Sequence, residues 1–175
     1  MVNKRSFFAY LAQACIKLDI PTREKLIIVS GGACIVPGIR EETSDIDVVV
    51  TDYSLLDKFK AEGHNIEYRK PIGLKSGIHI MNIHNVSFIW YDKINPNMQA
   101  TEYRGYYLLT KESLLLDKVE LGRSKDLPDI EKLIQYSYTL DSKMYDRLSA
   151  LIQSNKQFSS KSYVDSWMEK FKFSP

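Results

Sequence analysis

Residues 26–50 have the sequence LIIVSGGACIVPGIREETSDIDVVV, and this stretch decides the fold. Its first four residues, Leu26–Val29, form a continuous apolar run that ends at Ser30-Gly31-Gly32, which is typical of a buried central strand followed by a tight turn. A second apolar run begins at Asp45-Ile-Asp47. Because alternate side chains of a strand share a face, Asp45 and Asp47 are expected side by side, with the apolar residues on the opposite face. The stretch therefore predicts two strands, one ending in a glycine turn and one beginning with paired carboxylates.

Hydrophobic spacing predicts the helices and strands outside this stretch. Apolar residues at helical spacing predict helices over residues 5–19, 54–62, 111–121, 142–153 and 161–171, a short helix from about residue 33, and a helix that begins at Asp126–Asp129. Apolar runs predict strands over residues 78–83, 86–91 and 106–109, with His84-Asn85 as a hairpin turn. The pattern predicts a single α+β domain over residues 1–175 with no second core. It has a mixed sheet of about four or five strands within about residues 22–110 and a helical C-terminal part over about residues 111–175.

Composition gives no sign of an overall field toward nucleic acid or an anionic membrane. The 175 residues include 24 basic and 22 acidic side chains, a formal net charge of +2, so any affinity for phosphate is expected to be local. Cys15 and Cys34 lie in apolar stretches without a second cysteine at metal-ligand spacing, which indicates buried thiols. No stretch approaches the roughly 20 apolar residues needed to cross a bilayer, so no membrane contact and a cytoplasmic location are expected.

The paired carboxylates favour a bound cation. Asp45 and Asp47 repel each other, and keeping them adjacent costs free energy unless a cation or hydrogen-bond donors compensate. Mg²⁺ prefers oxygen ligands and usually takes one or two carboxylates together with substrate phosphates. Gly31 and Gly32 would let backbone amides approach a phosphate closely. The combination predicts a Mg²⁺ or Mn²⁺ site that binds a phosphorylated substrate.

This order of motifs resembles the nucleotidyltransferase superfamily, whose polymerase-beta-like members place a glycine-rich turn after the first strand and an Asp-x-Asp or Asp-x-Glu pair on the next. The residues that match are Gly31, Gly32, Asp45 and Asp47. Residues 114–130, LLLDKVELGRSKDLPDI, are also similar to the lysine and basic-Asp-x-x-Asp segment of minimal nucleotidyltransferases of the AbiEii toxin type, which belong to toxin–antitoxin systems. The resemblance covers residues 26 to 134 and implies a nucleotidyltransferase-like fold.

The resemblance implies transfer of a nucleotidyl group from a nucleoside triphosphate such as ATP, assisted by Mg²⁺ or Mn²⁺. The acceptor would be a hydroxyl of RNA, including tRNA, of a protein or of a small molecule. The implied catalytic residues are Asp45, Asp47 and Lys118, with the two aspartates as metal ligands. The implied nucleotide-binding residues are Ser30, Gly31, Gly32, Thr43, Ser44, Lys125 and Asp126. Lys118 and the Lys125-Asp126 pair are expected to approach the Asp45/Asp47 face and stabilise phosphate charge.

The C-terminal segment also suits purely structural roles. Lys118, Arg123 and Lys125 fit the basic end of a helix that faces water, where cations interact favourably with the helix dipole. Asp126 and Asp129 fit the N-cap and first turn of the helix that begins there. Both interpretations of this segment stay open at the level of sequence.

A third carboxylate usually follows the Asp-x-Asp pair on another strand of active family members. Its expected position here is occupied by Ser87 or Phe88, which leaves Asp92, as a candidate third metal ligand, or Glu67 to replace it. Without such a replacement, catalysis would be weakened. The alternative is then a binding or regulatory module that has kept the nucleotidyltransferase fold.

A second enzyme class uses a similar motif. Residues 45–49 match the Asp-x-Asp-x-Val pattern of haloacid-dehalogenase-like phosphatases. In those enzymes, however, the nucleophilic aspartate ends a hydrophobic strand, whereas here Glu41–Ser44 precedes the pair and Val48–Val50 follows it. The expected strand polarity therefore disfavours a phosphatase.

Overall fold

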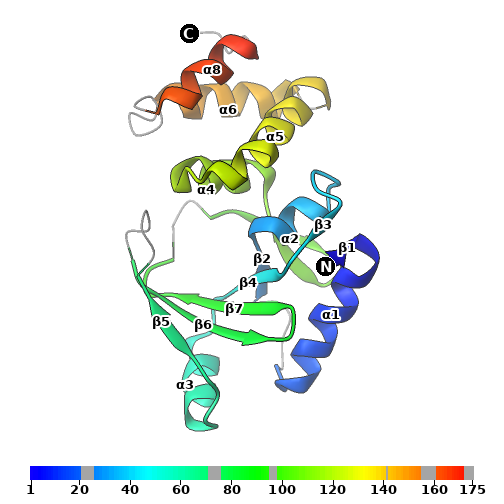
Figure 1. The fold of residues 1–175 in the computed structure, drawn as a ribbon, viewed down its shortest axis with the longest axis vertical. Helices are drawn as coiled ribbons and strands as arrows, with labels where there is room; N and C mark the ends of the chain where they lie inside the picture. The colour runs from blue at the N-terminus through cyan, green and yellow to red at the C-terminus, as the bar shows by residue number, and fades with distance from the viewer. Residues whose placement is uncertain (21–25, 71–75, 95–97, 141, 155–160, 172–175) are drawn as a thin grey trace. The chain divides into compact units, whose positions relative to one another are not determined.

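The computed structural model describes residues 1–20, 26–70, 76–94, 98–140, 142–154 and 161–171 (Figure 1). By its contacts the chain divides into two compact units, unit 1 at Met1–Ser113 and unit 2 at Leu114–Pro175. The boundary between the units lies close to the predicted start of the helical C-terminal part.

Unit 1 is built on a seven-stranded mixed sheet with the strand order β5-β6-β7-β4-β2-β9-β8. The strands are β2 (Leu26–Ile28), β4 (Ile46–Val50), β5 (Glu67–Arg69), β6 (Ile78–Ile83), β7 (Val86–Tyr91), β8 (Ala100–Tyr103) and β9 (Tyr106–Leu109). The pairs β2–β9 and β4–β7 are parallel and the other neighbours are antiparallel. The α+β class and the mixed sheet are confirmed. The prediction of four or five strands was too low, because the edge strands β5 and β8 are largely exposed and lack an apolar pattern.

A second, two-stranded sheet ties the N-terminus to the segment that leads into β4. β1 (Val2–Asn3) pairs antiparallel with β3 (Glu42–Thr43) in the register Val2↔Thr43. Val2 and Thr43 are both buried. Strands of two residues carry no periodicity, so hydrophobic spacing does not predict them.

Two helices contribute the apolar residues that pack with one face of the large sheet. They are α1 (Lys4–Lys17) and α3 (Tyr53–Ala61). The buried cluster combines Phe7 and Leu11 of α1, Phe59 of α3 and Val48 of β4, among others. The predicted helices are confirmed, although α1 ends two residues earlier than expected. Tyr10 of α1 is 36% exposed, although its spacing matches that of the buried residues of this helix.

The predicted glycine turn is the start of a helix. α2 runs from Ser30 to Ile35 and begins directly after β2, so the turn prediction was wrong and the short helix starts about three residues early. Ser30 has a φ of +56°, in the left-handed region that non-glycine residues rarely adopt. Such positions cost of order 1–3 kcal/mol and persist only where the surroundings hold them.

Unit 2 is helical, as predicted for this part of the chain. Its elements are α4 (Lys111–Leu121, which begins in unit 1), the 3₁₀ turn η2 (Ser124–Asp126), α5 (Leu127–Leu140), α6 (Ser142–Ser154) and α8 (Ser162–Lys170). Thr110 caps α4, because its Oγ1 accepts a hydrogen bond of 3.2 Å from the Ser113 amide. The serine-rich segment 154–160, between the predicted helices 142–153 and 161–171, lies, apart from Ser154, outside the described residues.

Unit 2 also buries apolar residues on each of these helices: Leu114, Leu115, Val119, Ile130, Leu133, Ile134, Leu148, Ile152, Val164 and Trp167. The expectation of a single domain with no second core stays a prediction. In the part of the chain that the structure describes, no helix combines the length and the apolar character that crossing a membrane requires.

Candidate functional site

The end of β2 and the start of β4 lie together because these strands are antiparallel neighbours. Ile28 pairs with Val48, and the Val29 amide donates a hydrogen bond of 3.0 Å to the Asp47 carbonyl oxygen. Ser30, which follows Val29 in the chain, therefore begins α2 beside the strand position of Asp47. The two sequence motifs that lie about fifteen residues apart meet at one end of two central strands.

The two carboxylates occupy the start of β4. Asp45 lies directly before the strand and is exposed, and Asp47 is its second residue and is partly buried. The Ser44 hydroxyl donates a hydrogen bond of 2.8 Å to Asp45 Oδ1. Ser44, predicted to bind nucleotide, thus orients the Asp45 carboxylate. The position of both aspartates at the beginning of the strand confirms the polarity that disfavours a phosphatase.

Gly31 and Gly32 are both buried, and close packing explains why these two positions are glycines. A Cβ atom on Gly31 would lie 2.6 Å from Thr43 Oγ1, and one on Gly32 would lie 2.9 Å from the Phe7 ring. Distances this short exclude a side chain at either position without movement of a neighbour. Thr43 is itself buried against Gly31. The phosphate and nucleotide contacts implied for these three residues remain predictions.

No third carboxylate accompanies Asp47 on the neighbouring strands. Asp47 pairs with Ser87 of β7, and Ser87 pairs with Asn82 of β6, so one row across three strands is Asp47-Ser87-Asn82. The Ser87 hydroxyl donates a hydrogen bond of 2.8 Å to Asn82 Oδ1. The position next to Asp47 is therefore occupied by a hydroxyl, with a side-chain amide beyond it.

Neither Asp92 nor Glu67, the two candidates for the third carboxylate, lies close enough to join this row. Asp92 lies five residues beyond Ser87, which is about 16 Å along a strand. The candidate role of Asp92 as a third metal ligand was therefore wrong. Glu67 lies on the edge strand β5, three strands or about 14 Å from β4, and forms an ion pair with Arg69.

Asp92 belongs instead to a small polar and aromatic cluster at the far end of β7. The Tyr68 hydroxyl donates a hydrogen bond of 2.9 Å to Asp92 Oδ2, and His79 Nε2 lies 3.8 Å from Asp92 Oδ1. The hydrogen bond to Asp92 raises the pKa of Tyr68, with smaller contributions from burial and from the charge of Asp92. These contacts account for Asp92 without a metal.

The donors near Asp47 suit a hard cation. Together, Asp45 and the row Asp47-Ser87-Asn82 offer two carboxylates, a hydroxyl and an amide carbonyl, all of them oxygen ligands that Mg²⁺ and Mn²⁺ accept. Within the described ranges, no group of three or more His, Cys, Asp or Glu side chains is placed to hold a metal ion. A metal held by Asp45 and Asp47 would therefore take most of its ligands from water or from substrate phosphates, as Mg²⁺ commonly does.

In unit 2, Lys118 lies at the centre of a buried ionic cluster. Its side chain is 2% exposed, and Nζ donates to Asp126 Oδ1 at 3.1 Å and to Asp129 Oδ2 at 2.9 Å. Arg123 Nε donates to the second oxygen of Asp126 at 2.6 Å. Burial raises the pKa of Asp126, but the hydrogen bonds and charges of Arg123 and Lys118 act more strongly, so the net shift is downward.

These contacts revise the roles expected for the C-terminal segment. Asp126 uses its two oxygens for Lys118 and Arg123, so ion pairs account for this carboxylate, and its role as a helix N-cap stays a prediction. The ion pairs account for Lys118 without a phosphate, although a role of Lys118 in transfer stays a prediction. Lys125 is exposed. The expected approach of Lys118 and Lys125 to the Asp45/Asp47 face would join the two units and also stays a prediction.

Sequence reasoning missed Asp117, which adjoins this cluster on α4. Burial raises the pKa of Asp117 from 3.8 to about 6, although the charges of Lys118 and Arg123 lower it. A pKa in this range is typical of acid–base groups but also occurs in structural ion networks. The available signal was its helical position three residues after the buried Leu114.

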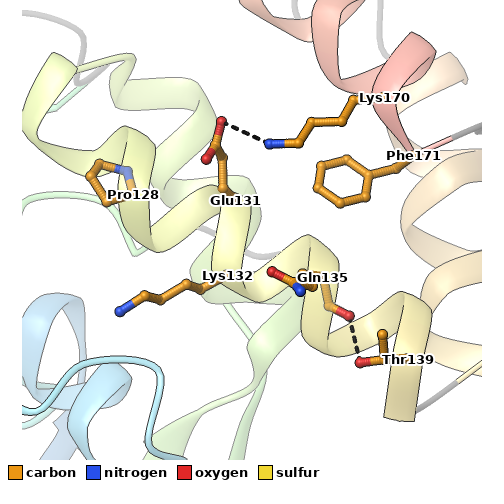
Figure 2. A pocket seen from close by; sticks show the side chains of 7 residues that line it. All are labelled: Pro128, Glu131, Lys132, Gln135, Thr139, Lys170 and Phe171. Carbon is orange, nitrogen blue, oxygen red and sulfur yellow. Dashed lines mark hydrogen bonds and ion pairs between the residues drawn. The ribbon is translucent and has the colours of Figure 1, made fainter.

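A groove in unit 2 contains none of the predicted site residues. It has a volume of about 610 Å³ and is lined by Pro128, Glu131, Lys132, Gln135, Thr139, Lys170 and Phe171. Figure 2 shows the ion pair that joins the two helices at this groove, with Lys170 Nζ 3.5 Å from Glu131 Oε1. The pair links α5 to α8 and indicates a structural role for these side chains.

Comparison with known proteins gives only distant similarities. No protein-family model matches the chain, and no curated protein matches it in sequence. Among solved structures, JHP933 from Helicobacter pylori is similar at 14% identity and a TM-score of 0.48, over 94% of this chain and 82% of that chain. An H. pylori structure provisionally designated a nucleotidyltransferase is similar at 12% identity and a TM-score of 0.48, over 98% and 91% of the two chains. Likeness at this level establishes neither a family nor an activity.

Proposed function

We propose that the chain is a metal-dependent nucleotidyltransferase that moves a nucleotidyl group from a nucleoside triphosphate to an acceptor hydroxyl. The acceptor belongs to RNA, including tRNA, to a protein or to a small molecule. The observation that carries the proposal is the hydrogen bond from Val29 to Asp47, because it joins the start of α2 to the paired carboxylates. The unusual φ of Ser30 at this point adds support, since backbone strain collects at functional sites.

Each residue of the site has a defined part in this proposal. Asp45 and Asp47 would hold Mg²⁺ or Mn²⁺, which supplies positive charge for the phosphates and for the charge that develops during transfer. Ser44 holds the Asp45 carboxylate in place through its hydrogen bond of 2.8 Å. Ser30 and the backbone of Gly31 bind the triphosphate. In this scheme Lys118, Lys125 and Asp126 act on the nucleotide as the sequence implies.

A second candidate function follows from the row Asp47-Ser87-Asn82. Active nucleotidyltransferases usually have a carboxylate beside the Asp-x-Asp pair, and this chain has Ser87 at the paired position. A hydroxyl gives a metal less charge compensation than a carboxylate. The alternative is therefore a module that binds a nucleotide with its metal, transfers it slowly or not at all, and serves in binding or regulation.

The deciding experiment compares nucleotide binding with nucleotide transfer. Isothermal titration calorimetry with each triphosphate, in Mg²⁺ and in excess chelator, measures whether binding depends on the metal. Incubation with labelled triphosphates plus total RNA or protein measures transfer. We expect Mg²⁺ to strengthen binding at least about tenfold, equivalent to about 1.4 kcal/mol, through ligands shared by the protein and the phosphates.

Asp47→Asn and Asp92→Asn form a matched pair of variants. Each removes one carboxylate, Asp47 in β4 and Asp92 directly after the end of β7, but only Asp47 lies beside the start of α2. Asp47→Asn should abolish the effect of Mg²⁺ on binding, and Asp92→Asn should retain it. Metal-dependent binding without transfer would favour the binding module. Equal triphosphate affinity in chelator and in Mg²⁺ would exclude both candidates.

A further inference from the structure

A basic pocket in unit 1 contains none of the site residues described above. It has a volume of about 640 Å³, within the range of small-molecule sites. Lys4 and Arg5 line it from the first turn of α1, and Arg40 and Glu41 line it from the segment before β3. Three positive charges and one negative charge therefore surround a single cavity.

The two basic segments are held side by side by the small sheet. β1 ends at Asn3 and β3 begins at Glu42, and these two residues are paired in the antiparallel register. Lys4 and Arg5 follow β1, whereas Arg40 and Glu41 precede β3, so pairing places both segments at the same end of the ladder. Their convergence on the pocket is a consequence of backbone topology as well as of side-chain conformation.

The charges around this pocket are unbalanced. Lys4 and Arg5 are exposed and form no ion pair with any of the described residues. The first turn of α1 contains no acidic residue, so these cations also oppose the positive end of the helix. Like charges gathered in this way cost free energy, which a bound anion would recover.

The backbone of α1 does not provide the anion site. The Asn3 side chain already accepts hydrogen bonds from the amides of Arg5, at 3.0 Å, and Ser6, at 3.1 Å. Binding would therefore depend on the basic side chains, which can be removed one at a time.

Arg40 connects the pocket to the start of α2. It is partly buried, and its Nη1 atom lies 3.2 Å from the position that a Cβ of Gly31 would occupy. Its side chain is thus packed and ordered before a ligand arrives, which lowers the entropy cost of binding. The planar guanidinium can bind two oxygens of one phosphate.

We propose that Lys4, Arg5 and Arg40 form a phosphate-binding site that takes a ligand with several phosphate groups. The phosphates belong to the polyphosphate tail of a nucleotide or to the phosphodiester backbone of a nucleic acid. This site goes beyond the proposed function because its binding groups are side chains, and no metal at Asp45 or Asp47 is required.

The test is calorimetric titration of the full chain at low ionic strength in excess chelator, so that metal-dependent nucleotide binding does not contribute. The two probes are inorganic tripolyphosphate and a single-stranded RNA hexamer with a 5′-hydroxyl group. The variants are Lys4→Gln/Arg5→Gln, Arg40→Gln and the combination of all three. Lys17→Gln/Lys60→Gln is the control, because it removes two charges from exposed positions of α1 and α3 that lie outside the pocket.

We expect at least one probe to bind the wild type and to bind the triple variant about tenfold more weakly or worse, while the control binds normally. Loss of tripolyphosphate binding alone identifies nucleotide phosphates, and loss of hexamer binding alone identifies a nucleic-acid backbone, with a smaller salt dependence in the variant. If Arg40→Gln does not fold, Lys4→Gln/Arg5→Gln decides the matter. The proposal is overturned if neither probe binds, or if the pocket variants and the control bind alike.

Discussion

Replacing Lys118 by methionine should lower the free energy of unfolding, because it removes the positive charge from a buried ionic cluster. The ammonium group is 2% exposed and contacts Asp126 at 3.1 Å and Asp129 at 2.9 Å. Methionine keeps most of the volume but leaves both buried carboxylates without this partner. Breaking a buried ion pair from one side costs about 3–5 kcal/mol. That is a large part of the roughly 5–15 kcal/mol by which a typical domain is stable.

Equilibrium unfolding in urea, followed by circular dichroism, measures this loss. The matched control is Lys125→Met, which removes the same group from an exposed position seven residues along and should change stability by less than about 0.5 kcal/mol. Adding Asp129→Asn to Lys118→Met should recover part of the loss, since it removes one of the two buried charges that Lys118 compensates.

Two results would refute the reasoning. One is a loss below about 1 kcal/mol for Lys118→Met at neutral pH. The other is a double variant no more stable than Lys118→Met alone, which would show that the charge of Asp129 does not depend on Lys118 for compensation. A transfer assay well below the unfolding midpoint then tests the catalytic role separately, because a purely structural lysine leaves the rate per folded molecule unchanged.

Two further variants test other parts of the structure. Burial raises the pKa of Asp117 from 3.8 in the unfolded chain to about 6 in the folded protein. As pH rises from about 4 to about 6, the unfolded chain loses this proton before the folded protein does, so the free energy of unfolding of the wild type should fall over this range. Asp117→Asn should therefore be more stable than the wild type above pH 6, by up to about 3 kcal/mol, and no more stable below pH 4. Urea unfolding at several pH values measures this, and an equal dependence of the unfolding free energy on pH in both proteins would contradict it. Gly32→Ala should lower stability by about 1–3 kcal/mol, because its methyl group would lie 2.9 Å from the buried Phe7 ring, and an unchanged melting temperature would show that the ring yields freely.

Elements with long apolar runs could be predicted from the sequence almost to the residue. The hairpin β6–β7 and strand β9 have the predicted ends, and α4 has the predicted bounds, directly after its cap Thr110. In these elements local pattern and burial agree. β5 and β8 are mostly exposed edge strands. They form by backbone pairing with a neighbouring strand, which requires no apolar pattern in their own sequences.

The candidate site was predictable in outline only. The adjacency of Ser30 and Asp47 followed from two consecutive apolar runs, which commonly pair. The start of α2 at Ser30 was not expected because glycine is a poor helix former, and this first turn is stabilised by long-range packing of Gly32 against Phe7. The misplacement of Asp92 has a similar cause, since strand register is fixed by three-dimensional pairing.

The parallel pairing of β2 with β9 determines when the sheet can be completed during synthesis. Ile27 pairs with Val49 after a short connection. Its partner on the other side, Tyr107, lies 80 positions after Ile27 and is synthesised much later. Loop closure over such a distance slows folding, so β2 and β4 can associate while one side of β2 still has unpaired backbone groups. An open strand edge of this kind is prone to pair with another chain. The emerging chain is therefore most vulnerable to aggregation between synthesis of β4 and arrival of β9, even though the strands that carry the candidate site are already present.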